Sequence, residues 1–283
     1  MKPSVIVLTF NSGASLGATL ASIRNLTDDI HVVDSGSIDN TVEIATAAGA
    51  EVTYHAFENY GRQRNWAIDN LILKYSWQLH LDADERLTPE LRDEILSLSE
   101  DHRCSGFFIP RLLRFLGRVL KHGGMSPTWH MRLFKSGSGR CENREYDQHF
   151  YCEGQTGRLK QAMIDDIRMS LSEWTSRHNR WSDAEVREAL QSRSDGKVRG
   201  RISGNPVEKR RFLRRGYERM PLFIRAFGLF TFRYVIMLGF LDGVEGAIFW
   251  ILQTFWFRFL IDAKLYEHRL SHDQDCAAAK LEI

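Results

Sequence analysis

The chain of 283 residues is 43% hydrophobic and 26% charged, a composition that excludes a disordered or collagen-like protein and allows one or two folded domains. Its formal net charge of +2 excludes a globally basic nucleic-acid-binding protein, so we expect no nucleic-acid partner. The four cysteines form no CxxC pair, which favours free thiols in a reducing cytosol over a zinc ribbon. The apolar run at 5–8 is too short for a signal peptide, which predicts a chain on the cytosolic side.

Strand and helix patterns alternate over residues 1 to about 110. Short apolar runs rich in β-branched or aromatic residues predict strands at 5–8, 30–33, 51–54, 77–81 and 107–109. Apolar residues at helical spacing predict helices at 16–23, 42–48, 62–73 and from Pro89 onward. The alternation predicts an α/β fold with a mainly parallel sheet, in which ligands bind beyond the carboxyl ends of the strands.

The second half of the chain changes character near Gly200. Residues 165–195 are predicted to be helical, and a dense basic stretch at 199–219 is followed by aromatic and aliphatic segments at 222–241 and 246–261. We therefore expect a catalytic domain at 1–200, basic and aromatic amphipathic helices at 201–270, and a polar tail at 271–283.

The apolar C-terminal segments carry charges that argue against a membrane-spanning helix. These are Arg225, Arg233, Asp242, Glu245 and Arg258. A pair of amphipathic helices lying at the membrane surface through 205–262 is favoured, with the basic stretch on anionic lipid. A buried helical hairpin or a dimer interface is the alternative, so a homo-oligomer stays open.

Asp82-Ala83-Asp84 follows the predicted strand at 77–81 and places two carboxylates in the same region. Carboxylate oxygens suit Mg²⁺ or Mn²⁺, which keep open positions for phosphate oxygens. Such a metal would neutralise a diphosphate leaving group. A solvated turn with a helix cap is the alternative for this motif.

Two more clusters point to an anionic ligand. Asp34 ends the predicted strand at 30–33 and is followed by Ser35-Gly36-Ser37, where the glycine permits a tight turn. Asp34 is placed to accept hydrogen bonds from a nucleobase or ribose. Arg62 and Arg64 lie at a predicted helix N-terminus, where cations oppose the helix dipole, which favours contact with a phosphate or sugar over a solvated helix start.

Four ordered motifs together resemble family 2 glycosyltransferases with the Rossmann-like GT-A fold. They are Val-Leu-Thr-Phe-Asn at 7–11, Val-Val-Asp-Ser-Gly-Ser-Ile-Asp-Asn-Thr at 32–41, Gly-Arg-Gln-Arg-Asn at 61–65 and Leu-Asp-Ala-Asp-Glu at 81–85. The rest of the chain resembles, less sharply, the branch with lipopolysaccharide-core β-glycosyltransferases. In that branch a similar basic and aromatic segment, with a stretch like Gly-Phe-Leu-Asp-Gly at 239–243, follows the catalytic domain.

The resemblance implies a metal-dependent, inverting transfer from a nucleotide sugar, usually a UDP-sugar. It implies that Thr9 and Asn11 line the nucleotide pocket, that Asp34 holds the uracil, and that Arg62 and Arg64 lie near the donor.

On the metal side, the resemblance implies that Asp84 ligates Mg²⁺ or Mn²⁺ and that Asp82 touches the ribose or the metal's shell.

Inversion also requires a base that takes the proton of the acceptor hydroxyl. The family places this acid after the Arg-Leu-Phe strand, in a segment that corresponds to 140–149 here. Related sequences often carry His-Glu where this chain has Asp147-Gln148, and a glutamine cannot serve as the base. We predict Asp147 as the base with Glu145 as the second candidate, and a solvated loop as the alternative.

The sequence thus predicts a glycosyltransferase at the cytoplasmic face of the inner membrane, peripheral or monotopic. It would act on a glycan or lipid-linked acceptor in surface-polysaccharide or lipopolysaccharide biosynthesis. Two alternatives stay open: a polyprenyl-phosphate sugar transferase, and a nucleotide-sugar-binding or membrane scaffold protein with a decayed site.

Overall fold

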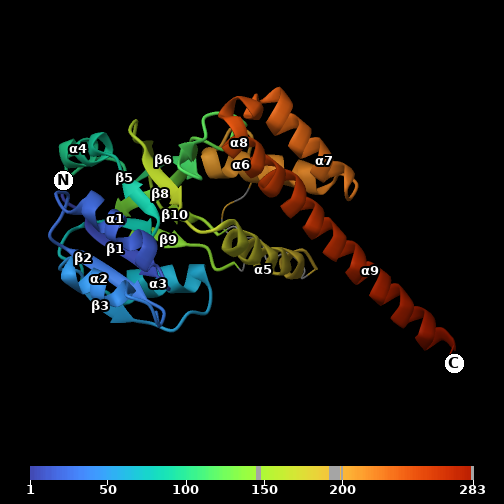
Figure 1. The fold of residues 1–283 in the computed structure, drawn as a ribbon. Helices are drawn as coiled ribbons and strands as arrows, with labels where there is room; N and C mark the ends of the chain where they lie inside the picture. The colour runs from blue at the N-terminus through green and yellow to red at the C-terminus, as the bar shows by residue number, and fades with distance from the viewer. Residues whose placement is uncertain (145–147, 191–197, 199, 282–283) are drawn as a thin grey trace.

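The computed structural model describes residues 1–144, 148–190, 198 and 200–281, with side chains through Ser271. A sheet flanked by helices forms the N-terminal part, and the C-terminal helices gather beside it (Figure 1). The last helix extends away from the sheet, so the two chain termini lie at opposite sides of the molecule.

The N-terminal half of the sheet is parallel, as predicted. It contains β1 (Ser4–Thr9), β2 (Ile30–Asp34), β3 (Glu51–Tyr54) and β4 (Trp77–Asp82), in the order β3-β2-β1-β4. The strands are apolar on both faces because helices cover them, and residues 5–7 of β1 are fully buried. The register pairs Thr9 with Asp34 and Leu8 with Asp82, so the polar strand ends meet at one edge.

The other half of the sheet is mixed. It continues from β4 through β8 (Thr128–Lys135), β6 (Gly106–Phe115), β12 (Met163–Ile167) and β5 (Glu85–Leu87). Both β4–β8 and β8–β6 are antiparallel, whereas β6–β12 is parallel. The short strands β7 (Arg118–Val119) and β11 (Thr156–Arg158) pair with β6, and β9 (Gly139–Cys141) pairs with β10 (Phe150–Cys152).

Four helices connect the strands of the N-terminal part: α1 (Gly13–Ile23), α2 (Thr41–Ala47), α3 (Tyr60–Asn70) and α4 (Pro89–Ser97). Each lies at or near its predicted place. The start of α4 follows its sequence signal, because Thr88 accepts a hydrogen bond from the N–H of Leu91 and Pro89 takes the first turn. Leu16, Leu20 and Ile23 of α1 pack into the core beneath the sheet.

The C-terminal region is helical throughout its regular elements. It comprises α5 (Leu171–Leu190), α6 (Pro206–Glu218), α7 (Ile224–Thr231), η1 (Phe232–Ile236), η2 (Gly239–Asp242), α8 (Gly243–Trp250), η3 (Ile251–Trp256) and α9 (Phe257–Leu281). Val186 of α5 packs against Phe257 and Ile261. The segment expected to be a polar tail begins inside α9, because no glycine or proline follows Gly246 to end the helix.

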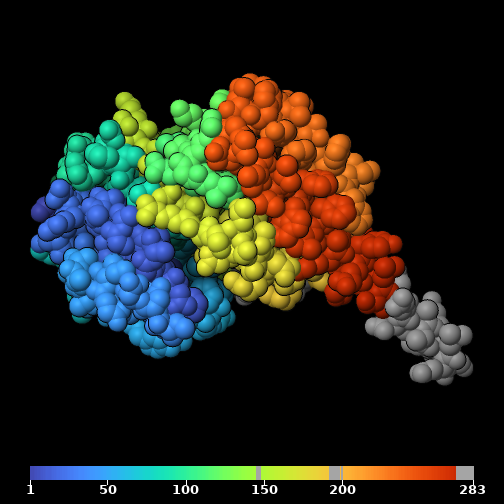
Figure 2. All heavy atoms as spheres, viewed as in Figure 1, coloured from blue at the N-terminus to red at the C-terminus, as the bar shows by residue number. Residues whose placement is uncertain are grey.

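The apolar C-terminal helices leave a large hydrophobic surface uncovered. Phe227, Ile236 and Val244 are 63%, 65% and 71% exposed. One stretch, Gly239–Ser271, is long and apolar enough to cross a membrane, with a mean hydropathy of 1.3 and a third of its window buried. Length and composition alone do not separate such a helix from one that lies on a surface. In Figure 2 these helices form a lobe at one end of the molecule, beside the sheet domain.

Candidate functional site

Asp82 lies where β4 ends and is held between two arginines. Its Oδ1 accepts a hydrogen bond from Arg64 of α3 at 2.8 Å, and its Oδ2 accepts one from Arg132 of β8 at 2.6 Å. Burial would raise the pKa of Asp82, but the charges of Arg132 and Arg64 hold it well below its usual range. Asp82 is therefore ionised and fixed in place at any physiological pH.

Glu85 joins Asp82 and Arg132 in the same hydrogen-bond network. Arg132 also donates to Oε1 of Glu85 at 2.6 Å, and Oε2 of Glu85 accepts from the N–H of Asp82 at 3.0 Å. Both Arg132 and Glu85 are almost fully buried. Sequence reasoning gave neither residue a role in the site, although a charged residue inside the apolar run at 131–134 is a signal of a buried partner.

Asp84 differs from Asp82 in having no donor. It is half-buried, and its carboxylate makes no hydrogen bond to any residue that the structure describes. Burial raises the pKa of Asp84 well above its usual value, and the nearby charges of Asp165, Asp82 and Glu85 add to the effect. The charge of Arg177 acts in the opposite direction, but within the described residues no arginine or lysine forms an ion pair with Asp84.

The chemistry of this carboxylate fits a divalent cation. The described residues contain no group of three or more histidine, cysteine, aspartate or glutamate side chains that could hold a metal ion. Asp84 alone fits a hard cation that keeps water and substrate phosphates as its other ligands, as Mg²⁺ commonly does. The site suits a metal bound together with a phosphorylated ligand rather than a permanent structural metal.

Asp34 organises the turn after β2. Its Oδ1 accepts hydrogen bonds from the hydroxyls of Thr9 and Ser37 at 2.8 and 2.6 Å, and its Oδ2 accepts from the N–H groups of Gly36 and Ser37 at 2.9 and 2.7 Å. Burial raises the pKa of Asp34, but these hydrogen bonds outweigh it and lower the pKa below its usual value. Four donors fill the acceptor positions of the carboxylate.

Asn11 links the turn after β1 to the same loop. Its backbone N–H donates to Oγ of Ser37 at 2.8 Å, and its Oδ1 accepts from the N–H of Ile38 at 2.9 Å. Its φ is +47°, a left-handed conformation that asparagine tolerates better than most residues. Thr9, Asn11 and Asp34 are thus brought together, as the sequence predicts.

The two arginines of α3 have different environments. Arg64 is buried, pairs with Asp82, and lies over the ring of Phe150 with 5.1 Å from its guanidinium carbon to the ring centroid. Arg62 is exposed and forms an ion pair with Glu58, which precedes α3 in the chain. The structure brings Arg64 to the Asp82 network and leaves Arg62 outside it.

The segment predicted to hold the base is anchored at its start by α3. Asn65 of α3 donates to the carbonyl of Cys141 at 2.8 Å and accepts from its N–H at 2.9 Å. Gly61 lies so close to this segment that a Cβ there would come within 2.2 Å of the carbonyl oxygen of Glu142. Asp147 and Glu145, the predicted bases, lie outside the described residues.

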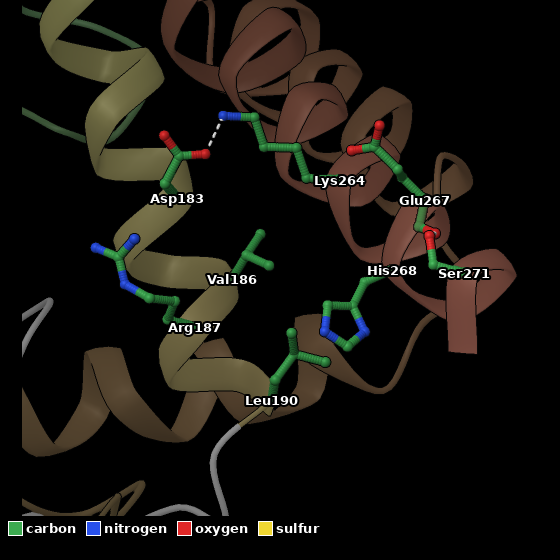
Figure 3. Close-up of a pocket in the computed structure, with 8 residues that line it drawn as sticks. All are labelled: Asp183, Val186, Arg187, Leu190, Lys264, Glu267, His268 and Ser271. Atoms are coloured by element: carbon green, nitrogen blue, oxygen red, sulfur yellow. Dashed lines mark hydrogen bonds and ion pairs between the residues drawn. The ribbon is translucent and has the colours of Figure 1, made fainter. Parts of the chain in front are cut away.

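The hollows on the surface lie elsewhere. A cavity of about 480 Å³ opens between α5 and α9, where Val186 and Leu190 face His268 and Asp183 pairs with Lys264 (Figure 3). A second, of about 330 Å³, lies beside β6 and β12 near Gly117. Neither is lined by Asp34, Asp82 or Asp84, so the candidate site is separate from both of these cavities.

The part of the chain that contains this site is similar to known proteins. The sequence model of Glycosyl transferase family 2 matches residues 4–164, which contain β1 to β4 and the Asp82-Ala83-Asp84 turn. An uncharacterized glycosyltransferase, RP128 of Rickettsia prowazekii, is 37% identical over 119 residues, which cover 41% of this chain. The match covers between 31% and 40% of the length of the rickettsial relatives.

Two further proteins match nearly the whole chain at lower identity. LpsC of Rhizobium meliloti, a lipopolysaccharide core biosynthesis glycosyltransferase, is 23% identical over 275 residues, covering 93% of this chain and 92% of LpsC. The solved structure of the mannosyltransferase PcManGT from Pyrobaculum calidifontis, in complex with GDP-Man and Mn²⁺, superposes with a TM-score of 0.51 at 14% identity, covering 94% of this chain and 87% of that one. The likeness confirms the predicted α/β fold.

Proposed function

The chain belongs to glycosyl transferase family 2, and from this premise we propose that it transfers a sugar from a UDP donor to a hydroxyl of its acceptor with inversion, using a divalent metal. The observation that carries the proposal is the contrast between two neighbouring carboxylates. Asp82 is neutralised by Arg64 and Arg132, whereas Asp84 has no donor among the described residues. A site with one unsatisfied carboxylate beside a fixed one suits a metal–diphosphate pair.

On the donor side, we assign the nucleotide to the edge formed by Thr9, Asn11 and Asp34. Because four protein donors already fill the Asp34 carboxylate, a hydrogen bond to uracil requires the Ser37 hydroxyl to rotate away. We place Arg64 near the donor through its contact with Asp82, which lies toward the ribose or the metal's shell. Arg62 reaches the donor only by leaving Glu58.

We assign Mg²⁺ or Mn²⁺ to Asp84. When bound, the metal neutralises the negative charge that develops on the departing diphosphate. Arg132 and Arg64 keep Asp82 ionised and oriented beside this position, while the buried Glu85 fixes the turn through the N–H of Asp82. The residues of the chain thus arrange the donor before the acceptor arrives.

For the acceptor, we propose Asp147 as the base that removes the hydroxyl proton, with Glu145 as the second candidate. Support comes from the anchored segment on either side of them. Asn65 holds Cys141 before the pair, and His149 after it hydrogen-bonds to Glu142 through both backbone groups. A carboxylate held opposite the leaving group is what an inverting displacement needs.

We further propose that the helices at 201–270 hold the 1–200 domain at the cytoplasmic face of the inner membrane, where a glycan or lipid-linked acceptor would lie. The exposed side chains of Phe227, Ile236 and Val244 support a surface that enters the lipid boundary. Full-length similarity to LpsC supports an acceptor in lipopolysaccharide or surface-polysaccharide assembly. A polyprenyl-phosphate acceptor would need no base, so an Asp147→Asn variant that keeps its transfer activity would favour that alternative.

Calorimetry of UDP binding tests the donor site. We expect wild-type protein to bind UDP only weakly in EDTA and at least tenfold more tightly with Mn²⁺, since the carboxylate and the diphosphate share the cation. Asp84→Ala should lose the Mn²⁺-dependent gain, whereas Asp101→Ala, an exposed carboxylate in a turn, should keep it. Folded wild-type protein that binds no UDP would overturn the UDP assignment. UDP binding of equal affinity with Mn²⁺ and with EDTA would overturn the metal assignment and favour a decayed site.

A further inference from the structure

Arg233 is a half-buried arginine of the C-terminal helices that forms no ion pair with a carboxylate of the described residues. Four other arginines of these helices do form such pairs: Arg211 with Glu142, Arg214 and Arg258 with Glu185, and Arg225 with Asp262. Within the described residues, the only hydrogen bond of the Arg233 side chain is to the carbonyl of Gly123, at 2.8 Å from Nη1. A guanidinium has five N–H donors, so most of its capacity is unused.

The pKa of Arg233 is lower than that of an ordinary arginine. Burial, with smaller contributions from the charges of Arg210 and Arg258, lowers the pKa of Arg233 to about 10. Arg233 stays protonated at neutral pH. A partly desolvated cation that has no carboxylate partner is costly unless an anion joins it.

The position of Arg233 in the chain gives the source of that anion. It lies in η1, a π-helical turn, and such turns are frequent at functional sites. Its neighbours Phe232, Val235 and Ile236 are exposed apolar side chains of the surface that we assign to the membrane. The guanidinium is therefore set among residues that would lie at the level of lipid headgroups.

We propose that Arg233 is a binding site for the phosphate group of a membrane lipid, at the boundary between the sheet domain and the apolar surface of η1. The inference rests on the proposed membrane docking and adds a specific ligand to it. A phosphate offers several oxygens in the geometry that a guanidinium fork matches.

The loop that Arg233 contacts is closely packed. Gly123 and Gly124 have φ of +73° and +72°, and a Cβ would come within 2.1 Å of Trp250 at Gly123 and within 3.1 Å of Met237 and 3.6 Å of Nη1 of Arg233 at Gly124. This packing holds Nη1 of Arg233 against the loop carbonyl and leaves the other N–H groups of the guanidinium for a ligand. A lipid held here would connect the apolar surface to the loop that leads into β8, the strand that carries Arg132.

Vesicle flotation of the full chain tests this site, with Arg233→Gln as the variant and Arg24→Gln as the matched control. Arg24 is an exposed arginine at the end of α1, so its substitution removes the same charge without touching the proposed site or the basic stretch. Vesicles of a neutral galactolipid without phosphate are compared with the same vesicles containing phosphatidylglycerol, each at low salt and at high salt.

At high salt, exposed charges are screened, so we expect Arg24→Gln, on the sheet domain, to bind phosphatidylglycerol vesicles as wild type does. Arg233→Gln should bind them about tenfold more weakly, because a charge-assisted hydrogen bond is lost. On the galactolipid vesicles both variants should match wild type. Arg233→Lys keeps the positive charge but not the paired N–H donors of the guanidinium, so its affinity for these vesicles should lie between those of wild type and Arg233→Gln. It replaces Arg233→Gln in the test if the glutamine variant does not fold.

The failures are distinguishable. Wild-type protein that floats with neither vesicle overturns the membrane docking itself. Wild-type protein that floats while Arg233→Gln equals it at high salt overturns the phosphate site and leaves the docking intact. Equal weakening on both vesicles, or a changed oligomeric state of Arg233→Gln in sedimentation, assigns Arg233 a packing role and also overturns the site.

Discussion

At the scale of single residues, the two aspartates of the Asp82-Ala83-Asp84 turn have identical side chains in different electrostatic environments. Arg64 and Arg132 hold the carboxylate of Asp82, which stays ionised, while the carboxylate of Asp84 has no hydrogen-bond donor among the described residues and is surrounded mainly by like charges, with Arg177 as an opposing charge. A cluster of carboxylates costs stability in the metal-free protein and is tolerable where a cation joins it.

This cost predicts the stability of an Asp84→Asn variant. Because the folded pKa of Asp84 is raised, its contribution to stability is full below the unfolded pKa near 3.9 and is lost as the pH rises through the folded pKa. In EDTA the variant should match wild type at pH 4 and melt about 2–4 °C higher at pH 8, the shift that roughly 1 kcal/mol gives in a chain of this size.

Adding UDP with Mn²⁺ should reverse the order at pH 8, because only wild type gains binding energy. Asp101→Asn serves as the control and should melt as wild type does throughout. Thermal melts of wild type, Asp84→Asn and Asp101→Asn measure these differences. An Asp84→Asn variant that melts below wild type in EDTA would show that Asp84 is a structural carboxylate.

At the scale of elements, a buried ion pair joins α6 to the segment after β9. Arg211 forms two hydrogen bonds to Glu142, and the side chains are 7% and 1% exposed. Oε1 of Glu142 accepts from the N–H of Val198 at 3.1 Å, and its Oε2 accepts from that of His149 at 3.2 Å. This one carboxylate ties α6, Val198 and the anchored segment around the proposed base.

Breaking the pair should therefore destabilise the protein and slow the reaction. We expect Glu142→Gln or Arg211→Met to cost about 3–5 kcal/mol in denaturant unfolding, because each leaves a buried polar group unsatisfied. The pair Arg140 and Asp69 is the control, since both side chains are nearly half exposed and the pair should contribute no more than about 1 kcal/mol. A Glu142→Gln variant as stable as Asp69→Asn would contradict the role of Glu142.

The same scale shows how far the sequence determines the fold. The strands at 5–8, 30–33 and 77–81 are predictable because short, mostly apolar runs bounded by polar turn residues favour strands buried on both faces. The ends of the first two place Thr9, Asn11 and Asp34 together. The strand β12 is missed, since two aspartates interrupt its apolar pattern, and so is the three-residue β5. Arg132 and Glu85 are missed because their pairing joins residues 47 apart in the chain, which local patterns do not reveal.

At the scale of the whole molecule, the C-terminal helices are locked onto the sheet domain. The buried Asp242 accepts hydrogen bonds from the N–H groups of Lys121 and His122, both at 3.0 Å. Trp250 packs so closely on Gly123 that a Cβ there would lie 2.1 Å from the indole ring. Removing these helices would uncover Trp250's partners in the domain, so substitutions on the exposed surface test membrane docking more cleanly than truncation.

The double variant Ile236→Glu with Val244→Glu is that test. Both side chains are exposed, so the fold should be kept, whereas placing two carboxylates at the lipid boundary should weaken vesicle binding at least tenfold. Ile72→Glu, at a side chain that is 92% exposed on the sheet domain, should bind vesicles as wild type does. Flotation with phosphatidylglycerol vesicles measures all three. The double variant could instead float as wild type does but sediment as a smaller species. That result would show that the apolar surface joins two copies of the chain and does not bind the membrane.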